Sequence, residues 1–234
     1  MRLFVALLFL VFTALPLRAQ ELVDLELVLA VDASGSVDAS EYALQMRGIA
    51  NAFRDPEVVA AIQSGPNQRI AVSLFLWAEH NLPKQPMAWY GVSTAQEAET
   101  FAKAVETLPR RIAAGATGIG KAIQFGVWEI EGNSYQGLRQ VIDVSGDGEE
   151  SPPQEYTVLL TQGRTFALNR GIVINGLPIQ TADNDLDKYY ASRVIGGPGA
   201  FAEPAYGFED FARAIRTKLI REIEYRPAIG MLVD

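Results

Sequence analysis

Short runs of aliphatic residues recur along the chain, separated by segments in which apolar residues return every three or four positions. One such run, residues 25–31, is rich in leucine and valine and stops at Asp32. Short apolar runs of this kind indicate buried β-strands, whereas a spacing of three or four predicts amphipathic helices. Strands are expected at residues 25–31, 68–77, 87–90, 139–144, 171–174 and 200–203. Helices are expected from Asp38 or Ser40 to residue 54, from Ser93 or Thr94 to residue 108, and at residues 156–169, 185–193 and 208–223. A further helix, which carries Ile123, Val127 and Ile130, is expected after the small-residue loop at 113–120.

The alternation of strands with helices predicts an α/β fold, in which a doubly wound, mostly parallel sheet of about six strands is flanked by helices. Residues 87–90 follow Pro83 and Pro86, so this strand is placed at a sheet edge, where a missing N–H is tolerated. Asn175-Gly176 is expected to form a turn after the strand at 171–174. At 234 residues the chain has room for a single large domain.

The first nineteen residues have a different pattern. Arg2 is followed by a largely apolar stretch over residues 3–15, and Ala19 lies where a cleavage site is expected. This arrangement predicts a secretory signal peptide at residues 1–19 and a periplasmic or secreted bacterial protein. An uncleaved anchor is the alternative, because Leu17 is larger than the residue usually found at that position. The apolar stretch is shorter than the ~20 residues that a spanning helix needs, and no membrane span is expected after cleavage.

Net charge limits the expected partners, and cysteine content limits the expected compartment. The chain has a formal net charge of −8, and loss of Arg2 and Arg18 with the signal peptide would lower it to −10. Nucleic acids and anionic membranes attract clustered basic residues, so neither is an expected partner. The chain has no cysteine. Export without disulfides suits a bacterial periplasm and argues against a small disulfide-stabilised scaffold.

Candidate chemistry begins where the strand at 25–31 ends. Asp32, Ser34 and Ser36 occupy alternate positions, with Gly35 between the two serines. Ligands of open α/β sheets bind at the carboxyl ends of strands, and Gly35 lets the backbone bend so that the three side chains converge. Clustered hard oxygens suit Mg²⁺ or Mn²⁺ better than softer metals. Taken alone, the same residues could equally cap the following helix.

Two more oxygen-bearing side chains occupy comparable places. Thr117 lies in a loop of small residues that leads into a helix, and Asp147 lies between two glycines after the strand at 139–144. If the strand order reverses beside the strand at 25–31, the loops after these two strands meet at the switch point. The residues predicted to surround one site are then Asp32, Ser34, Ser36, Thr117 and Asp147.

This combination of Asp-x-Ser-x-Ser, a later Gly-x-Thr loop and a later Asp-Gly at a strand end resembles the metal-ion-dependent adhesion site (MIDAS) of von Willebrand factor type A (vWA) domains. The resemblance extends over residues 20–228 and leaves a tail at 229–234. The sequence looks closer to an uncharacterised branch of exported bacterial vWA-like proteins than to integrins.

The resemblance implies a role for each residue. Ser34 and Ser36 would ligate a divalent cation directly, and Thr117 would do so directly or through water. Asp32 and Asp147 would bind mainly through water. Few direct carboxylates leave the cation under-neutralised, so an open position would attract an Asp or Glu carboxylate of a partner protein.

One departure from the family pattern is Gly146, where relatives often have threonine before the acid. It keeps the carboxylate of Asp147 and removes a hydroxyl beside it. Glu149 and Glu150 are expected to form a solvated acidic rim.

The favoured function is therefore an exported, metal-dependent protein-binding module, for adhesion or as a scaffold, that holds Mg²⁺, or Mn²⁺ or Ca²⁺. One alternative is a Mg²⁺-dependent phosphohydrolase with Asp32 as nucleophile; that class needs a second acid where this chain has Ser34, and Lys121 is the lysine candidate. Another is a purely structural metal with a binding surface elsewhere. The single histidine, His80, has no nucleophile elbow to serve, and no enzyme activity is expected.

Overall fold

The computed structural model describes residues 20–153, 155, 157–181 and 185–224. The predicted signal peptide and the tail at 229–234 lie outside the described residues. Within the described part of the chain, no helix combines the length and the apolar character needed to cross a membrane.

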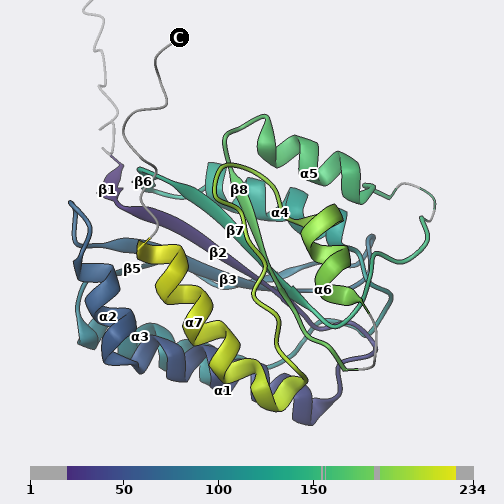
Figure 1. Ribbon diagram of the computed structural model, residues 1–234, viewed down its shortest axis with the longest axis horizontal. Coiled ribbons are helices and arrows are strands. Elements are labelled where there is room, and N and C mark those ends of the chain that lie inside the picture. The colour runs from purple at the N-terminus through teal and green to yellow at the C-terminus, as the bar shows by residue number, and fades with distance from the viewer. Residues whose placement is uncertain (1–19, 154, 156, 182–184, 225–234) are drawn as a thin grey trace, which may run out of the picture.

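A six-stranded sheet forms the centre of the molecule, with the order β4-β3-β2-β7-β8 and with β5 also paired to β3 (Figure 1). The parallel strands are β2 (Leu25–Asp32), β3 (Ile70–Trp77), β7 (Gln140–Gly146) and β8 (Val173–Pro178). The edge strands β4 (Gln85–Pro86) and β5 (Tyr90–Val92) run antiparallel to β3. A small parallel sheet joins β1 (Glu21–Val23) to β6 (Tyr135–Gly137). The predicted α/β class with a mostly parallel sheet is confirmed.

Helices cover both faces of this sheet (Figure 1). One face packs against α1 (Ala39–Arg54), α2 (Pro56–Gln63), α3 (Ala95–Glu106) and α7 (Phe211–Glu224), the last preceded by a 3-10 turn at Phe208–Asp210. The other face packs against α4 (Ile119–Glu131), α5 (Leu160–Leu168), α6 (Leu186–Tyr189) and the π-helical turn Tyr190–Val194.

β2 is buried on both faces. Leu27 and Leu29 point into the core beneath α1 and α7, whereas Val28 and Ala30 point into the core beneath α4. A strand covered by helices on both sides has no solvent face, so it carries an apolar run instead of an alternating pattern. This arrangement is the physical reason that residues 25–31 could be recognised as a strand.

Helix starts follow the polar residues that the sequence indicated. Asp38 caps α1 in a capping box with Glu41, and the Thr94 hydroxyl caps α3. Helix α2 was not predicted, although its signals are present: Asp55 accepts from the Glu57 N–H as the N-cap, and Pro56 is the first helical residue.

The edge elements differ from the prediction. Residues 87–89 connect β4 to β5 instead of forming one strand, although the Met87 N–H still donates to the carbonyl of Leu74. Residues 200–203 make only an isolated bridge between Ala202 and Gly176. Helix α5 begins at Leu160, later than expected. Edge segments have neighbours on one side only, so the sequence pattern that defines them is weak.

The predicted turn at Asn175-Gly176 is wrong, because both residues lie inside β8. Asn175 is buried, and its amide donates to Glu222 Oε1 (2.6 Å) while its carbonyl oxygen accepts from the backbone of Phe201 (3.0 Å). A polar side chain is tolerated within a buried strand when partners from other elements satisfy it.

Glu222 belongs to a buried charged cluster beneath α7. Lys218 is fully buried, with its Nζ 2.7 Å from Asp143 Oδ2 on β7 and 3.2 Å from Glu222 Oε1 one turn along the helix. With one lysine and two carboxylates, this cluster holds α7 against β7 and β8 by charge as well as by packing.

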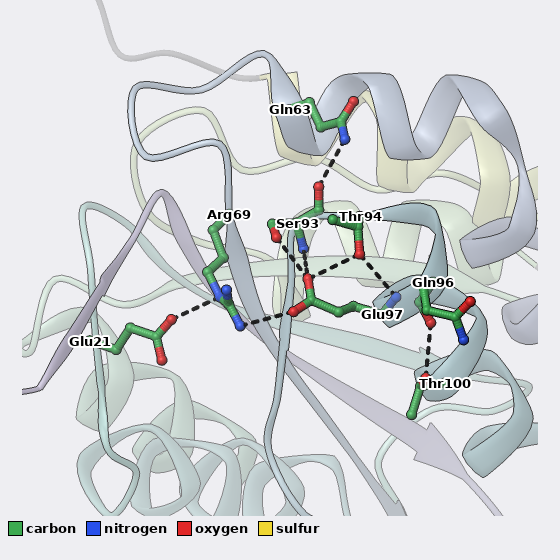
Figure 2. A network of polar contacts seen from close by, with 8 residues as sticks. All are labelled: Glu21, Gln63, Arg69, Ser93, Thr94, Gln96, Glu97 and Thr100. Carbon is green, nitrogen blue, oxygen red and sulfur yellow. Dashed lines mark hydrogen bonds and ion pairs between the residues drawn. The ribbon is translucent and has the colours of Figure 1, made fainter.

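A second polar network lies at the amino-terminal end of β3 (Figure 2). Arg69 pairs with Glu21 on β1 (2.9 Å) and with Glu97 in the first turn of α3 (3.4 Å). Glu97 also accepts from both the N–H and the hydroxyl of Ser93, and Gln63 at the end of α2 donates to the Ser93 carbonyl. The network ties four elements together at the end of the sheet remote from the tips of β2 and β7.

Replacing Lys218 by methionine should destabilise the fold strongly. The change removes the cation that pairs with Asp143 and Glu222. At pH 8, where Asp143 is ionised, breaking such a buried pair from one side costs about 3–5 kcal/mol in the free energy of unfolding. Urea denaturation measures this loss. Lys188→Met is the matched control, because Lys188 pairs with Asp185 on the exposed surface and should show no measurable change. Equal stability of the two variants would contradict the assignment.

The same cluster predicts a pH dependence. Burial raises the pKa of Asp143 from 3.8 to about 7, opposed by Lys218 and assisted by the charge of Glu222. Between these values the folded chain binds a proton that the unfolded chain does not, so this group's contribution to stability falls as the pH rises from about 4 to 7. Asp143→Asn should reduce that slope by up to ~1.4 kcal/mol per pH unit. Urea midpoints between pH 5 and 8 test this, and parallel curves for both proteins would refute it.

Candidate metal site

The chain turns sharply after Asp32, the last residue of β2. Asp32 Oδ1 accepts a hydrogen bond from the backbone N–H of Ser34 (2.7 Å), a local turn that favours aspartate. The hydroxyls of Ser34 and Ser36 lie 3.1 Å apart. Asp32 and Ser34 are buried, whereas Ser36 is exposed. These three side chains converge at the strand tip, with one end of the cluster open to solvent.

The loop after β7 meets this turn because β2 and β7 are adjacent parallel strands, with Val31 opposite Ser145. Ser36 Oγ donates to Asp147 Oδ1 at 2.8 Å, a contact across 111 positions of sequence. Asp147 is half-buried. The predicted meeting of the two loops at one edge of the sheet is therefore present in the structure.

The loop that carries Thr117 lies against both of these segments. The Gly35 N–H donates to the carbonyl of Gly115 (2.8 Å). Thr117 Oγ1 lies 3.6 Å from the point where a Cβ on Gly148 would stand, next in sequence to Asp147. Ser151 fixes the backbone of Thr117 through reciprocal bonds: its Oγ accepts from the Thr117 N–H and its N–H donates to the Thr117 carbonyl, both at 2.9 Å.

Two further residues hold the β2 turn from behind. The Arg110 guanidinium donates to three backbone carbonyls of the turn, those of Val37 (2.7 Å), Ala33 (2.8 Å) and Ser34 (3.0 Å). Buried Gln45 on α1 donates to the carbonyl of Asp32 (3.2 Å). These bonds fix the backbone of the turn and leave the side chains of Asp32, Ser34 and Ser36 facing the candidate site.

The electrostatics of Asp32 favour a cation. Burial, followed by the charge of Asp147, raises the pKa of Asp32 to about 7, against the lowering effect of the Ser34 N–H. Asp32 Oδ2 is buried and has no hydrogen-bond partner among the described residues. A positive charge between the two carboxylates would compensate for both the repulsion and the burial.

The donor set fits a hard divalent cation. Among the described residues, no group of three or more histidine, cysteine, aspartate or glutamate side chains could hold a metal. The gathered side chains offer two carboxylates and three hydroxyls, all oxygen donors, which suit Mg²⁺, Mn²⁺ or Ca²⁺.

Comparison with known protein families identifies the family of this chain. The family model described as "Protein of unknown function (DUF1194)" matches residues 22–227, almost the whole described chain. This chain belongs to the DUF1194 family. No curated protein matches the sequence.

Solved structures similar to this DUF1194 chain are vWA domains and proteins that contain them. The pilus adhesin SpaC from Lactobacillus rhamnosus GG has a TM-score of 0.61 at 15% identity, over 88% of this chain and 31% of that one. Proximal thread matrix protein 1 from the mussel byssus has a TM-score of 0.61 at 14% identity, over 87% and 47%. A further structure of that mussel protein has a zinc-occupied MIDAS motif, with a TM-score of 0.57 at 14% identity, over 86% and 46%.

The vWF domain of the pilus tip protein Mfa5 from Porphyromonas gingivalis has a TM-score of 0.53 at 9% identity, over 88% of this chain and 98% of that one. This chain thus matches nearly all of the Mfa5 domain, but less than half of the pilus adhesin and of the mussel protein. At these identities the likeness concerns the fold alone. The resemblance to vWA domains is confirmed at that level.

The expectation for Glu150 in this DUF1194 protein is wrong. Glu149 is exposed, but Glu150 is largely buried: its Oε2 accepts from the Gly120 N–H at the start of α4 (3.1 Å), and its Oε1 lies 3.7 Å from His80 Nδ1. Burial raises the pKa of Glu150 to about 7 and lowers that of His80. Gly118 at the N-cap of α4 has no side chain, so Glu150 acts as its cap from a distant loop.

Replacing Arg110 by methionine should loosen the β2 turn of the DUF1194 protein. Three carbonyls would lose a charged donor, so we expect a loss of about 1–3 kcal/mol in the free energy of unfolding and faster amide exchange at residues 33–37. Hydrogen exchange with urea denaturation measures both. Arg111→Met is the matched control, because its side chain is exposed on the same loop. Unchanged exchange in Arg110→Met would show that the turn does not depend on this residue.

Proposed function

We propose that this DUF1194 protein is an exported, metal-dependent protein-binding module. A divalent cation, held by Asp32, Ser34, Ser36, Thr117 and Asp147, would bind an acidic residue of a partner protein. The module spans residues 20–228 after removal of the signal peptide at 1–19, and acts in the periplasm or outside the cell.

The observation that carries the proposal is the contact of Ser36 with Asp147. Their hydrogen bond of 2.8 Å joins the two strand-tip loops, and Ser34 lies within 3.1 Å of Ser36. Oxygen donors from distant segments are thereby collected near the buried carboxylate of Asp32, which forms no ion pair with the described residues. A cation would offset both the burial of Asp32 and its repulsion by Asp147.

The site also has the exposure that partner binding requires. Ser36 is exposed and Asp147 half-exposed, whereas Asp32 and Ser34 are buried. A cation here would be held from the protein side and reachable from solvent on the other, so a carboxylate of a second protein could replace one of its waters. The similar folds of pilus and thread matrix proteins support an adhesive role.

The phosphohydrolase alternative has less support. Lys121, the lysine candidate for such a site, donates to Gln124 Oε1 (2.8 Å) and its Nζ lies 5.0 Å from the ring centroid of Trp128. Both partners lie further along α4, so the ammonium group is directed away from the end of the helix that adjoins Thr117. We therefore favour a binding function for the site over hydrolysis.

Mg²⁺ or Mn²⁺ should stabilise the wild-type protein, and Ser34→Ala should abolish that effect. A metal concentration of about 100 times the Kd adds ~2.7 kcal/mol to the free energy of unfolding. Thermal unfolding in metal and in chelator measures the gain. Ser40→Ala, an exposed serine on α1, is the matched control and should keep the full metal effect. Identical melting of wild type in metal and chelator would refute the proposed metal site.

The partner is tested separately, by capture from a periplasmic extract on immobilised wild type and Ser34→Ala in metal and in chelator. A specific protein retained only by wild type with metal supports the proposal. Retention in all four conditions would mean that the binding surface lies elsewhere and that the metal is structural.

A further inference from the structure

Tyr190 occupies a slot built from two glycines. It is the first residue of the π-helical turn after α6 and is fully buried. A Cβ on Gly146 would stand 2.8 Å from its hydroxyl, and a Cβ on Gly176 would stand 2.7 Å from its ring. Val144 lies opposite Gly176, so the two glycines are neighbours on one face of β7 and β8. The sheet therefore lacks side chains where the ring of Tyr190 passes.

The slot brings the Tyr190 hydroxyl to the candidate metal site. The point that a Cβ on Gly146 would occupy is also 2.9 Å from Asp32 Oδ2. The Tyr190 hydroxyl and Asp32 Oδ2 thus both border the space that a side chain at position 146 would fill. Both atoms are buried, and neither has a hydrogen-bond partner among the described residues.

The hydroxyl of Tyr190 is not needed for packing. Packing against Gly176 needs only the aromatic ring, which phenylalanine would supply equally well. After burial, the negative charges of Asp32 and Asp147 raise the pKa of the Tyr190 hydroxyl. Both carboxylates are hydrogen-bond acceptors when ionised. Buried donors and acceptors are rarely left unpaired, so a donor beside an acceptor points to a bond between them or to a water that bridges them.

We propose that Tyr190 is a positioning residue of the metal site, whose hydroxyl donates to Asp32 Oδ2 directly or through one bound water. It replaces, from the π-helical turn, the hydroxyl that Gly146 does not provide on β7. Asp32 then has both oxygens fixed, Oδ1 by the Ser34 N–H and Oδ2 by Tyr190. The inference rests on the proposed metal binding and adds the residue that orients one of its carboxylates.

Tyr190→Phe should weaken Mg²⁺ or Mn²⁺ binding by about tenfold or more, as expected for loss of a hydrogen bond to a charged group. Its urea midpoint without metal should fall only modestly, because the ring still fills the slot and the metal-free protein loses a single hydrogen bond. Tyr189→Phe is the matched control: its hydroxyl accepts from the Glu150 N–H (3.2 Å), and its removal should leave the metal affinity unchanged. Calorimetric titration of the metal into each full-length protein gives the affinities.

A second pair of variants tests the geometry. Gly146→Ser should destabilise the wild-type protein, because its Cβ meets both the Tyr190 hydroxyl and Asp32 Oδ2. It should be better tolerated in Tyr190→Phe, where the first of these two contacts is absent. The double variant Gly146→Ser with Tyr190→Phe should recover part of the lost affinity, since it returns a hydroxyl to β7.

The outcomes separate the two proposals. If wild type binds metal and Tyr190→Phe binds it equally well, the role of Tyr190 is overturned and the proposed function stands. If wild type binds no divalent ion, both are overturned. If affinity falls equally in Tyr190→Phe and Tyr189→Phe, the effect is not specific to the hydroxyl that faces Asp32, and the inference is rejected.

Discussion

The parallel pairing of β2 with β7 is the constraint on which the rest of the structure depends. The two strands run in register from Glu26 opposite Gln140 to Val31 opposite Ser145, so their carboxyl ends reach the same edge of the sheet together. This pairing brings the loops that carry Asp32 and Asp147 together at the candidate site. A shift of this register would separate the loops and turn buried apolar side chains to the wrong face. The cores on both sides of β2 therefore fix the geometry of the candidate site as well as the fold.

Two buried carboxylates lie on opposite faces of the sheet. Asp143, in the middle of β7, pairs with Lys218 beneath α7, and Asp32, at the end of β2, lies on the other face beside Gly146. The first carboxylate has its cation within the chain. The second, Asp32, accepts the backbone N–H of Ser34 and forms no ion pair with the described residues. This difference separates a charge that stabilises the packing of a helix from a charge suited to an external ion.

Similar folds occur in a pilus adhesin, a pilus tip protein and a mussel thread protein, which are different molecules in different settings. Function on a shared fold lies in the residues grafted on it. In this chain Gly146, Tyr190 and Arg110 place a glycine, a phenol and a guanidinium around the same strand tip as the five candidate site residues.

The sequence by itself determined the class of fold and the candidate residues. Buried parallel strands carry apolar runs, and helices begin at capping residues. Asp-x-Ser-x-Ser at a strand end is likewise a local pattern that can be recognised from neighbouring residues in the sequence. Only the tertiary structure decided which polar residues are buried and what they contact. Asn175-Gly176 has the composition of a turn, yet Glu222 and the backbone of Phe201 satisfy Asn175 inside β8. Glu150 resembles a surface acid, yet it caps α4, and Tyr190 has no motif at all. Each depends on partners tens of residues away, and such contacts leave no periodicity in the local sequence.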